Sequence, residues 1–417
     1  MYLCRPIRLR EALRIISREA NRIKDTETIP IRDALHRVLA ENVESTRDIP
    51  PFDRAAMDGY AVRSADTLGA SNEEPISLKI VGESDVGAPY TKNISGGEAV
   101  YVHTGAMIPR GADAVVPIEY TKSYGEKVYI FRSVPSGQNV SKKGEDVKKG
   151  EIILRKGRLI EPYDIAMLKK IGISKIRVYR KPLVSIFSCG NELVESIEQL
   201  SEGKIVECSR EIIMGLAKQY GCNINDLGIV PDAEEKIIST IKNATKSSDM
   251  IITIGGTSIG KHDLIPKIIQ RHGKLLFHGI SIQPGKPICA GKIDEKLILG
   301  IPGPPVAAYI AGITVMKKAI ESMLNYSEEI VIPKIRAILA RKIWSRPGIR
   351  TYVRVKIEKR DDEYYAEPIM ISGSGVLSSL VKSNGIIEIP EELEGIEEGT
   401  TVEVKLIRSV FDARNNL

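Results

Sequence analysis

The sequence predicts a multidomain α/β protein built around one doubly wound α/β domain. Its 417 residues suffice for roughly three domains, at about 150 residues each. Between residues 179 and 326, apolar runs of strand length alternate with helix-like runs, which is typical of a parallel sheet with right-handed crossovers. Short β-like runs separated by turns fill residues 46–149 and recur after residue 327. We therefore expect an α/β domain flanked by β-rich domains.

The composition is that of a soluble globular protein, with 42% hydrophobic and 27% charged residues. No apolar run approaches the roughly 20 residues of a membrane-spanning helix, and the N-terminus lacks the apolar segment of a secretory signal. The net charge of +6 is spread over interleaved Lys and Glu, without the basic stripe and stacking aromatics of nucleic-acid binding. We expect a cytoplasmic protein that binds neither a membrane nor a nucleic acid.

The cysteines and histidines argue against two kinds of metal site. The five cysteines are scattered without a CxxC pair, which indicates neither a zinc site nor a disulfide framework. None of the five histidines stands in an HExxH spacing, so a His-ligated transition-metal enzyme is not expected.

The N-terminal part predicts a discontinuous, helical linking domain. Apolar residues at helical spacing predict one helix over residues 7–24 and another over residues 31–43. Because Ile49-Pro50-Pro51 cannot continue a helix, residues 46–149 are assigned to an inserted β-rich domain. Residues 150–178 return to mixed structure and join residues 1–45 in the linking domain. Residues 179–326 then form the α/β domain, in which Ser209 is expected to cap a helix, and residues 327–417 form a C-terminal β-barrel-like domain.

Two carboxylates follow strand-like runs of the α/β domain. Ligands of open α/β sheets bind where strands end and polar turns begin. Glu192 lies in the turn CGNEL and Asp232 in VPDAEE. As alternatives, Glu192 complements a helix dipole and Asp232 is a helix N-cap.

The turn ITIGGTSIGKHD is the sharpest of these signals. Its backbone N–H groups and hydroxyls can converge on an anion. Asp263 would repel that anion unless a cation bridges them, which indicates Mg²⁺. The alternative is a tight turn with a helix-capping aspartate. The residues concerned are Gly255, Gly256, Thr257, Ser258, Gly260 and Asp263.

Proline-rich turns complete the set. In QPGKPI, Lys286 stands between Pro284 and Pro287, and a lysine is a compact charge suited to an oxyanion; otherwise it is a surface lysine. In IPGPP, Pro302 and Pro305 either shape a site or start a helix. Together the turns suit a phosphorylated ligand with Mg²⁺.

Further polar turns occur outside this domain. Asp58 lies in PPFDRAAMDGYAV, Thr104 in HTGAMIPRGADAVVPIE and Asp146 in GEDVKKG. By themselves these stretches are more typical of turns than of a site.

Eight motifs in order give the chain a strong resemblance to the MoeA family of molybdopterin molybdenumtransferases, which includes the E domain of gephyrin. The resemblance covers residues 7 to about 408. The motifs are FDRAAMDGYAV, TGAMIPRGADAVVPIE, GQNVSKKGEDVKKGE, SCGNELVE, GIVPDAEE, IGGTSIGKHD, QPGKPICAG and IPGPPVAAY.

The resemblance implies a Mg²⁺-dependent transferase that inserts molybdate into adenylylated molybdopterin and releases AMP. The sequence does not separate molybdate from tungstate. It also implies elongated homodimers of four-domain subunits, with an active cleft that draws on both subunits. The α/β domain would resemble molybdopterin adenylyltransferase, which is also a candidate protein partner. Two alternatives stay open: a molybdopterin-binding or scaffold protein with weak or no catalysis, and a molybdopterin adenylyltransferase.

The resemblance also assigns roles to single residues. Those implied in catalysis are Asp58, Thr104, Asp146, Glu192, Asp232, Asp263 and Lys286. The candidate ligands of Mg²⁺ are Asp58, Asp232 and Asp263. The residues implied in binding molybdopterin or the oxyanion are Gly255, Gly256, Thr257, Ser258, Gly260, Pro287, Pro302, Pro305 and Ser374.

Several positions depart from the family pattern. Pro304 and Ala307 stand where PGNPVS has Asn and Ser, and Gln283 stands where a lysine often precedes PGKP. TGDEL reads CGNEL, and Ser209 stands where an Asn is expected.

Overall fold

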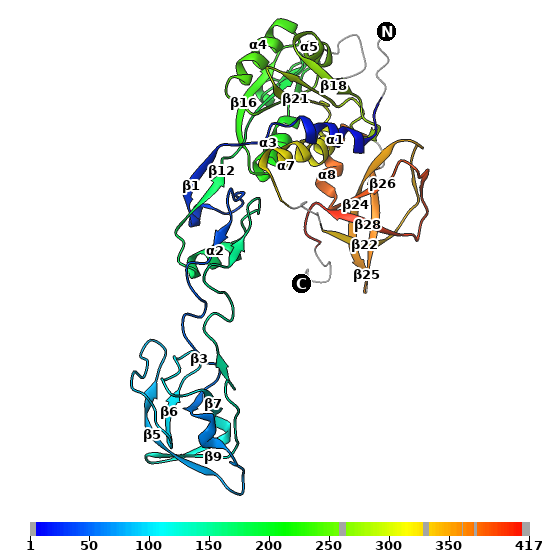
Figure 1. Cartoon of the computed structure of the whole chain (residues 1–417). Helices are drawn as coiled ribbons and strands as arrows, with labels where there is room; N and C mark the ends of the chain where they lie inside the picture. Colours follow the sequence, from blue (N-terminus) through cyan, green and yellow to red (C-terminus); the bar gives the residue numbers. More distant parts are fainter. Residues whose placement is uncertain (1–5, 258–263, 328–332, 361, 371–372, 411–417) are drawn as a thin grey trace.

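The computed structural model describes residues 6–257, 264–327, 333–360, 362–370 and 373–410. Figure 1 shows an elongated chain, with the α/β and C-terminal parts at one end and the inserted β-rich part at the other. In the described residues, no helix combines the length and the apolar character needed to cross a membrane.

The α/β domain is built on a six-stranded sheet with the strand order β16-β13-β17-β21-β20-β18. The first four strands pair in parallel, and β20 runs antiparallel to both of its neighbours, β21 and β18. Every residue of β17 is buried, as expected for a parallel strand covered on both faces. The strands are β13 (Leu183–Cys189), β16 (Asn223–Val230), β17 (Met250–Ile254), β18 (Lys274–His278), β20 (Cys289–Ile293) and β21 (Lys296–Ile301).

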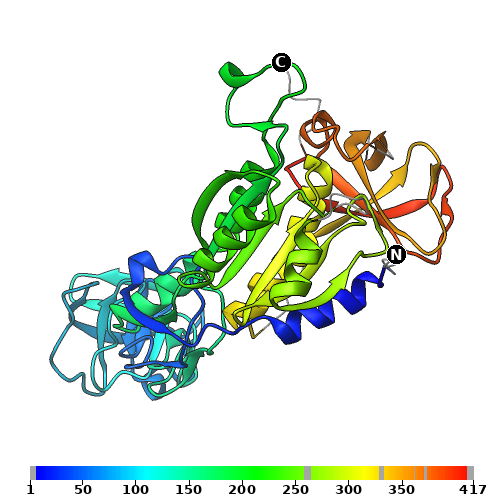
Figure 2. The ribbon, with the colours of Figure 1, turned by 90° about the horizontal axis from the view of Figure 1, so that it is seen from above.

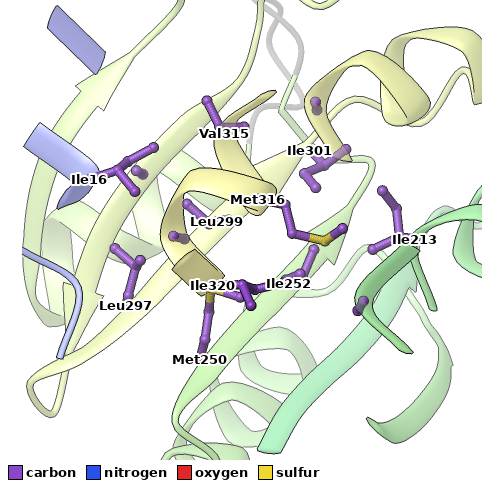
Figure 3. Close-up of a cluster of buried hydrophobic side chains, with 14 of the residues drawn as sticks. Ile16, Ile213, Met250, Ile252, Leu297, Leu299, Ile301, Val315, Met316 and Ile320 are labelled. Atoms are coloured by element: carbon purple, nitrogen blue, oxygen red, sulfur yellow. The ribbon is translucent and has the colours of Figure 1, made fainter. Parts of the chain in front are cut away.

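Helices cover both faces of this sheet, as Figure 1 and Figure 2 show. One face carries α4 (Glu234–Thr245) and α5 (Leu264–His272). The other carries α1 (Leu9–Glu19), α3 (Ser209–Gln219), α6 (Pro305–Ala311), the π-helical turn η5 (Gly312–Met316) and α7 (Lys317–Leu324). In Figure 3, side chains of the sheet meet those of η5 and α7 in this core. The helix α1, which the sequence assigns to the linking domain, therefore packs on the α/β domain. The boundaries of the four domains stay a prediction.

The strand order places a topological switch point between β13 and β17. The chain leaves β13 through α3 to reach β16 on one side, then passes through α4 to β17 on the other side. In open α/β sheets, a crevice forms at the carboxyl ends of strands that flank such a point. Cys189 and Ile254 end these two strands, so the turn CGNEL and residues 255–257 both open into this crevice.

The linking part has its own core, but it contains less helix than the sequence suggests. The helix expected over residues 31–43 is wrong: only the 3₁₀ turn η1 (Ile31–Asp33) forms there. Val38 and Leu39 instead make β-bridges to Leu159 and Val178, because long-range pairing overrides local helix propensity. The remaining elements are β1 (Thr26–Pro30) paired with β12 (Lys175–Tyr179), β2 (Val43–Glu44) paired with β11 (Ile152–Leu154), and α2 (Pro162–Lys170).

The inserted part is a separate β unit. Its six-stranded sheet has the order β7-β4-β6-β5-β9-β8, and β3 pairs with β10 beside it. Figure 1 shows it well away from the α/β domain of the same chain. The strands are β3 (Arg54–Ala55), β4 (Gly59–Val62), β5 (Ile76–Ser84), β6 (Glu98–Val102), β7 (Ala114–Pro117), β8 (Thr121–Tyr124), β9 (Lys127–Ile130) and β10 (Val140–Ser141).

The C-terminal part closes into a small barrel, because β24 pairs with both β25 and β26. The strand β19 (Ile282–Gln283), which precedes the QPGKP turn, pairs in parallel with β24. A backbone ladder thus joins the α/β domain to the barrel. The barrel elements are β22 (Lys334–Leu339), β23 (Ile343–Trp344), β24 (Arg350–Arg360), β25 (Glu363–Met370), α8 (Ser378–Lys382), β26 (Gly385–Ile389), β27 (Gly395–Ile396) and β28 (Thr401–Leu406).

A partly buried ion pair joins the linking part to the start of the α/β sheet. Arg180 donates to both carboxylate oxygens of Asp249, at 2.6 and 2.8 Å, and the Leu183 N–H adds a bond of 2.8 Å. Burial pushes the pKa of Asp249 upward, but the bonds from Arg180 and Leu183 outweigh it and hold the pKa below the ordinary 3.8. The ionised carboxylate therefore stabilises the fold above that pH, and this contribution is lost as the pH falls through the lower folded value.

Asp249→Asn is expected to lower the free energy of unfolding by about 2 kcal/mol at pH 7. The loss should shrink as the pH falls below about 4, where the wild-type carboxylate also loses its charge. Asp25→Asn is the matched control, because Asp25 also contacts Arg180 but its side chain is 73% exposed; its expected cost is below about 1 kcal/mol. Urea denaturation followed by circular dichroism measures both. Equal costs for the two variants would contradict the prediction.

Candidate functional site

Two adjacent cavities lie at the carboxyl ends of β13, β17 and β21. The first, the basic lobe, has a volume of about 540 Å³ and is lined by three cationic side chains. The second, the acidic lobe, has a volume of about 650 Å³ and is lined by three glutamate or aspartate side chains. Four backbone positions line both lobes and form what we call the partition: Gly255, Gly256, Gly303 and Pro304.

The cations of the basic lobe come from two domains. Lys286 is exposed on the QPGKP turn, and Arg346 and Arg354 belong to the C-terminal part. Arg354 is fully buried and donates to Ser379 Oγ at 3.2 Å and to the Tyr352 carbonyl at 3.3 Å. Burial lowers the pKa of Arg354 from its ordinary value. An anion in this lobe would offset the cost of desolvating the guanidinium.

The acidic lobe combines carboxylates with apolar walls. Glu192, Glu207 and Asp232 line it. Asp232 and Asn191 bond reciprocally: the Asn191 N–H donates to Asp232 Oδ2 at 3.3 Å, and the Asp232 N–H donates to Asn191 Oδ1 at 3.1 Å. The two turns after β13 and β16 are therefore tied together. The apolar side chains of this lobe are Leu193, Ile205, Val206, Ile254 and Leu377; the first three belong to an excursion that contains β14 (Leu193–Val194) and β15 (Ile205–Val206).

At Gly255, the partition depends on close backbone packing that only glycine permits. Gly255 has φ +90°, and a Cβ there would lie 2.4 Å from the Cys189 carbonyl oxygen. Its N–H donates to the Ile301 carbonyl at 2.9 Å. A Cβ on Gly303 would lie 3.7 Å from Gly255 Cα. The turns after β13, β17 and β21 thus stack backbone against backbone.

The PGPP turn starts α6 and also builds the partition. Pro304 is the N-cap and Pro305 the first helical residue. The Val306 N–H donates to the Ser374 carbonyl of the C-terminal part at 2.9 Å. The expectation that Ser209 caps a helix is wrong: Cys208 is the N-cap of α3, and Ser209 Oγ instead donates to the Gly303 carbonyl at 2.6 Å.

The structure brings most of the predicted residues of this domain to the two lobes. In the basic lobe are Gly255, Gly256, Thr257, Lys286, Pro287, Pro302 and Ser374, and in the acidic lobe are Gly255, Gly256, Glu192, Asp232 and Pro305. Asp232 is not a helix N-cap, because Ala233 has that position in α4. The QPGKP turn does not follow a strand of the central sheet; it follows β19, which pairs with the barrel.

Three predicted residues lie away from the lobes in the single chain. Asp58 Oδ1 accepts bonds from the Thr104 N–H at 2.6 Å and from Thr104 Oγ1 at 3.0 Å. The backbone bond first, and then the hydroxyl, hold the pKa of Asp58 below its ordinary value. Asp146 pairs with Lys170 at 2.9 Å. All three belong to the inserted part or its junction, which Figure 1 separates from the α/β domain.

Three other predicted residues, Ser258, Gly260 and Asp263, lie outside the described residues. Among the residues that are described, no three His, Cys, Asp or Glu side chains gather in a way that could hold a metal ion. Of the two predicted Mg²⁺ ligands that the structure describes, Asp58 and Asp232, only Asp232 lies at a lobe. Within one described subunit, the fit to Mg²⁺ is therefore incomplete.

Sequence reasoning missed Arg346 and Arg354. Both lie in SRPGIRTYVR, where a Pro-Gly turn at Pro347 and Gly348 leads into the strand β24; this turn precedes a strand of the C-terminal part and does not follow a strand of the α/β sheet. Only the ladder between β19 and β24 brings this stretch beside the QPGKP turn. Three of the positions that depart from the family pattern also line the basic lobe: Gln283, Pro304 and Ala307.

Comparison with known proteins gives matches along almost the whole chain. Residues 7–172 match the "MoeA N-terminal region (domain I and II)", residues 185–322 the "Probable molybdopterin binding domain" and residues 336–407 the "MoeA C-terminal region (domain IV)". The molybdopterin molybdenumtransferase of Bacillus subtilis is 33% identical over 97% of this chain and 94% of its own length.

The chain belongs to the MoeA family. A solved MoeA structure, the molybdopterin biosynthesis protein of Pyrococcus horikoshii OT3, is 38% identical to this MoeA-family chain. The match covers 96% of this chain and 100% of the Pyrococcus horikoshii chain, with a TM-score of 0.84. The molybdopterin molybdenumtransferase of Haemophilus influenzae is 31% identical over 91% of this chain and 93% of its own length. The multidomain MoeA fold, with its α/β domain and β-rich domains, is thereby confirmed.

Proposed function

We propose that this chain is a molybdopterin molybdenumtransferase, which inserts molybdate or tungstate into adenylylated molybdopterin and releases AMP. It acts in molybdenum cofactor biosynthesis, in line with the names of its relatives. The observation that carries the proposal is the pairing of two lobes of opposite character across one backbone partition. An inorganic dianion and an organic substrate can meet there within reacting distance.

The basic lobe receives the oxyanion. Three cations from two domains converge on it, and a tetrahedral dianion is attracted to each of them. The backbone of Gly255–Gly256 and the buried Thr257 line the same lobe. Hydrogen bonds from the Gly256 N–H and the Thr257 hydroxyl would orient an oxyanion or phosphate, while the Gly255 N–H donates to the Ile301 carbonyl.

The acidic lobe receives the organic part of the substrate. Its apolar walls suit a flat heterocycle, and ionised carboxylates accept hydrogen bonds from ring N–H and amino groups. Glu192 and Asp232 are placed to do so. The substrate would then lie across the partition, with its phosphate at the Gly255–Gly256 turn.

A homodimer completes the site. Asp58, Thr104 and Asp146 lie far from both lobes of their own chain, as Figure 1 shows for the inserted part. The elongated shape leaves the inserted part free to reach a lobe of a second copy, and most homodimers are two-fold symmetric. Mg²⁺, when bound, neutralises the phosphates; Asp232, together with Asp58 of that second copy and Asp263, would hold it. We further propose the division into four domains, a cytoplasmic location and a molybdopterin adenylyltransferase as the source of the substrate.

AMP release from adenylylated molybdopterin, titrated with molybdate and with tungstate, tests this function. Release that saturates with either oxyanion is the expected result. Binding of the pterin without release for either oxyanion would instead identify a binding or scaffold protein. Pyrophosphate formed from ATP and molybdopterin would identify an adenylyltransferase.

A further inference from the structure

On the PGPP side, the partition has few backbone donors to hold its position. Pro304 and Pro305 both lack an N–H, so the turn has lost two donors that could bind it to its surroundings. The first N–H after them is that of Val306. It donates to the Ser374 carbonyl, which belongs to the C-terminal part and not to the α/β domain. The wall is thus held from the barrel side by one backbone bond.

Ser209 holds the same wall from the opposite side. It is 3% exposed, and its Oγ donates to the Gly303 carbonyl at 2.6 Å. This hydroxyl is not used to cap α3, because Glu207 Oε1 accepts the Arg210 N–H at 2.9 Å at the start of that helix. The side-chain hydroxyl of Ser209 therefore donates to the partition and not to its own helix. This bond attaches Gly303 to the amino end of α3.

We propose that Ser209 is a positioning residue, which fixes the partition so that ligands in the two lobes are aligned for reaction. The inference rests on the proposed function and goes beyond it. Ser209 lines the acidic lobe only, but Gly303, which it anchors, lines both lobes. A shift of this wall changes the distance between the two reactants more than the contacts that each makes in its own lobe.

Ser209→Ala is expected to lower kcat for AMP release by about tenfold, since small misplacements of reacting groups are costly. The KM for the oxyanion and the Kd for adenylylated molybdopterin should stay within about twofold, because the change removes only the Ser209 hydroxyl, whose hydrogen is donated to Gly303, and leaves the charged side chains of both lobes in place. Ser209→Thr retains the hydroxyl and should restore most of kcat. Ser383→Ala is the matched control: Ser383 is 2% exposed and its Oγ donates to the Leu380 carbonyl at 3.0 Å, but it lines neither lobe.

A second readout does not depend on turnover. Hydrogen exchange of the full chain should become about tenfold faster at the amides of Val306 and Ala308 in Ser209→Ala, because a looser turn opens more often. The exchange should stay unchanged in Ser383→Ala.

An unchanged kcat in Ser209→Ala, or a loss carried entirely by KM or Kd, would overturn the positioning role. If the wild-type chain releases no AMP with either oxyanion, the proposed function fails. The exchange experiment then decides the anchoring by itself: unchanged exchange in Ser209→Ala would refute it.

Discussion

Replacing Lys286 with alanine is expected to lower oxyanion-dependent AMP release by about a hundredfold or more, with the chain still folded. Lys286 is exposed on a turn whose backbone is fixed by the β19–β24 ladder, so its side chain is dispensable for folding. Its ammonium supplies one of three positive charges around the basic lobe. Without it, a dianion loses an attraction that water does not replace in a partly enclosed cavity.

Steady-state AMP release at a series of molybdate and tungstate concentrations measures this effect. The KM for the oxyanion should rise, and Lys286→Arg should recover part of the rate because it keeps the charge. Lys246→Ala serves as the control, since Lys246 is an exposed lysine at the end of α4 that bonds Asn243 at 3.1 Å, away from both lobes. Wild-type rates of AMP release in Lys286→Ala would show that Lys286 does not bind the oxyanion.

Mixing two inactive variants is expected to restore activity if the inserted part of one copy completes the site of the other. Asp58→Asn keeps the side-chain shape and the contact with Thr104 but loses the charge. Lys286→Ala damages the basic lobe. A mixed dimer of the two variants then contains one site with neither change, so random pairing of equal amounts should give about one quarter of wild-type AMP release.

Coexpression with two different affinity tags, followed by isolation of the doubly tagged species, measures this directly. The doubly tagged dimer should reach about half of the wild-type rate per molecule, because one of its two sites is intact. Each variant alone, carried through the same purification, is the control. A mixed dimer as inactive as its parents would show that Asp58 and Lys286 act in the same copy. Wild-type activity of Asp58→Asn alone would show that Asp58 is not part of the site.

The glycine and proline turns of the α/β domain could be located from the sequence because their chemistry is local. Gly255 needs a positive φ and Pro305 a first helical turn, and both requirements leave a trace in a few neighbouring residues. The alternation of strands and helices predicted the sheet, and with it the convergence of CGNEL, VPDAEE and residues 255–257 at one edge.

No nearby sequence pattern predicts the other parts of the site. The full burial of Arg354, which is 0% exposed, depends on how α8 and β24 pack together, and both elements are distant in the chain from the lobe residues of the α/β domain. The bond from Ser209 to Gly303 joins positions 94 residues apart. The local sequence shows only a serine at the start of a helix, which predicts a cap. The false helix over residues 31–43 has the same origin, because bridges to residues 159 and 178 determine its backbone.

The sequence by itself determined the family, the α/β domain and the turns that carry the partition, since turn chemistry and hydrophobic periodicity act over a few residues. The tertiary structure alone decided that the QPGKP turn is joined to the barrel, that two arginines complete the basic lobe and that Ser209 and Ser374 hold the PGPP turn from opposite sides. It also decided that Asp58 lies away from the lobes of its own chain. These features depend on contacts between distant segments, whose energies come from burial and strand pairing that no single stretch of sequence encodes.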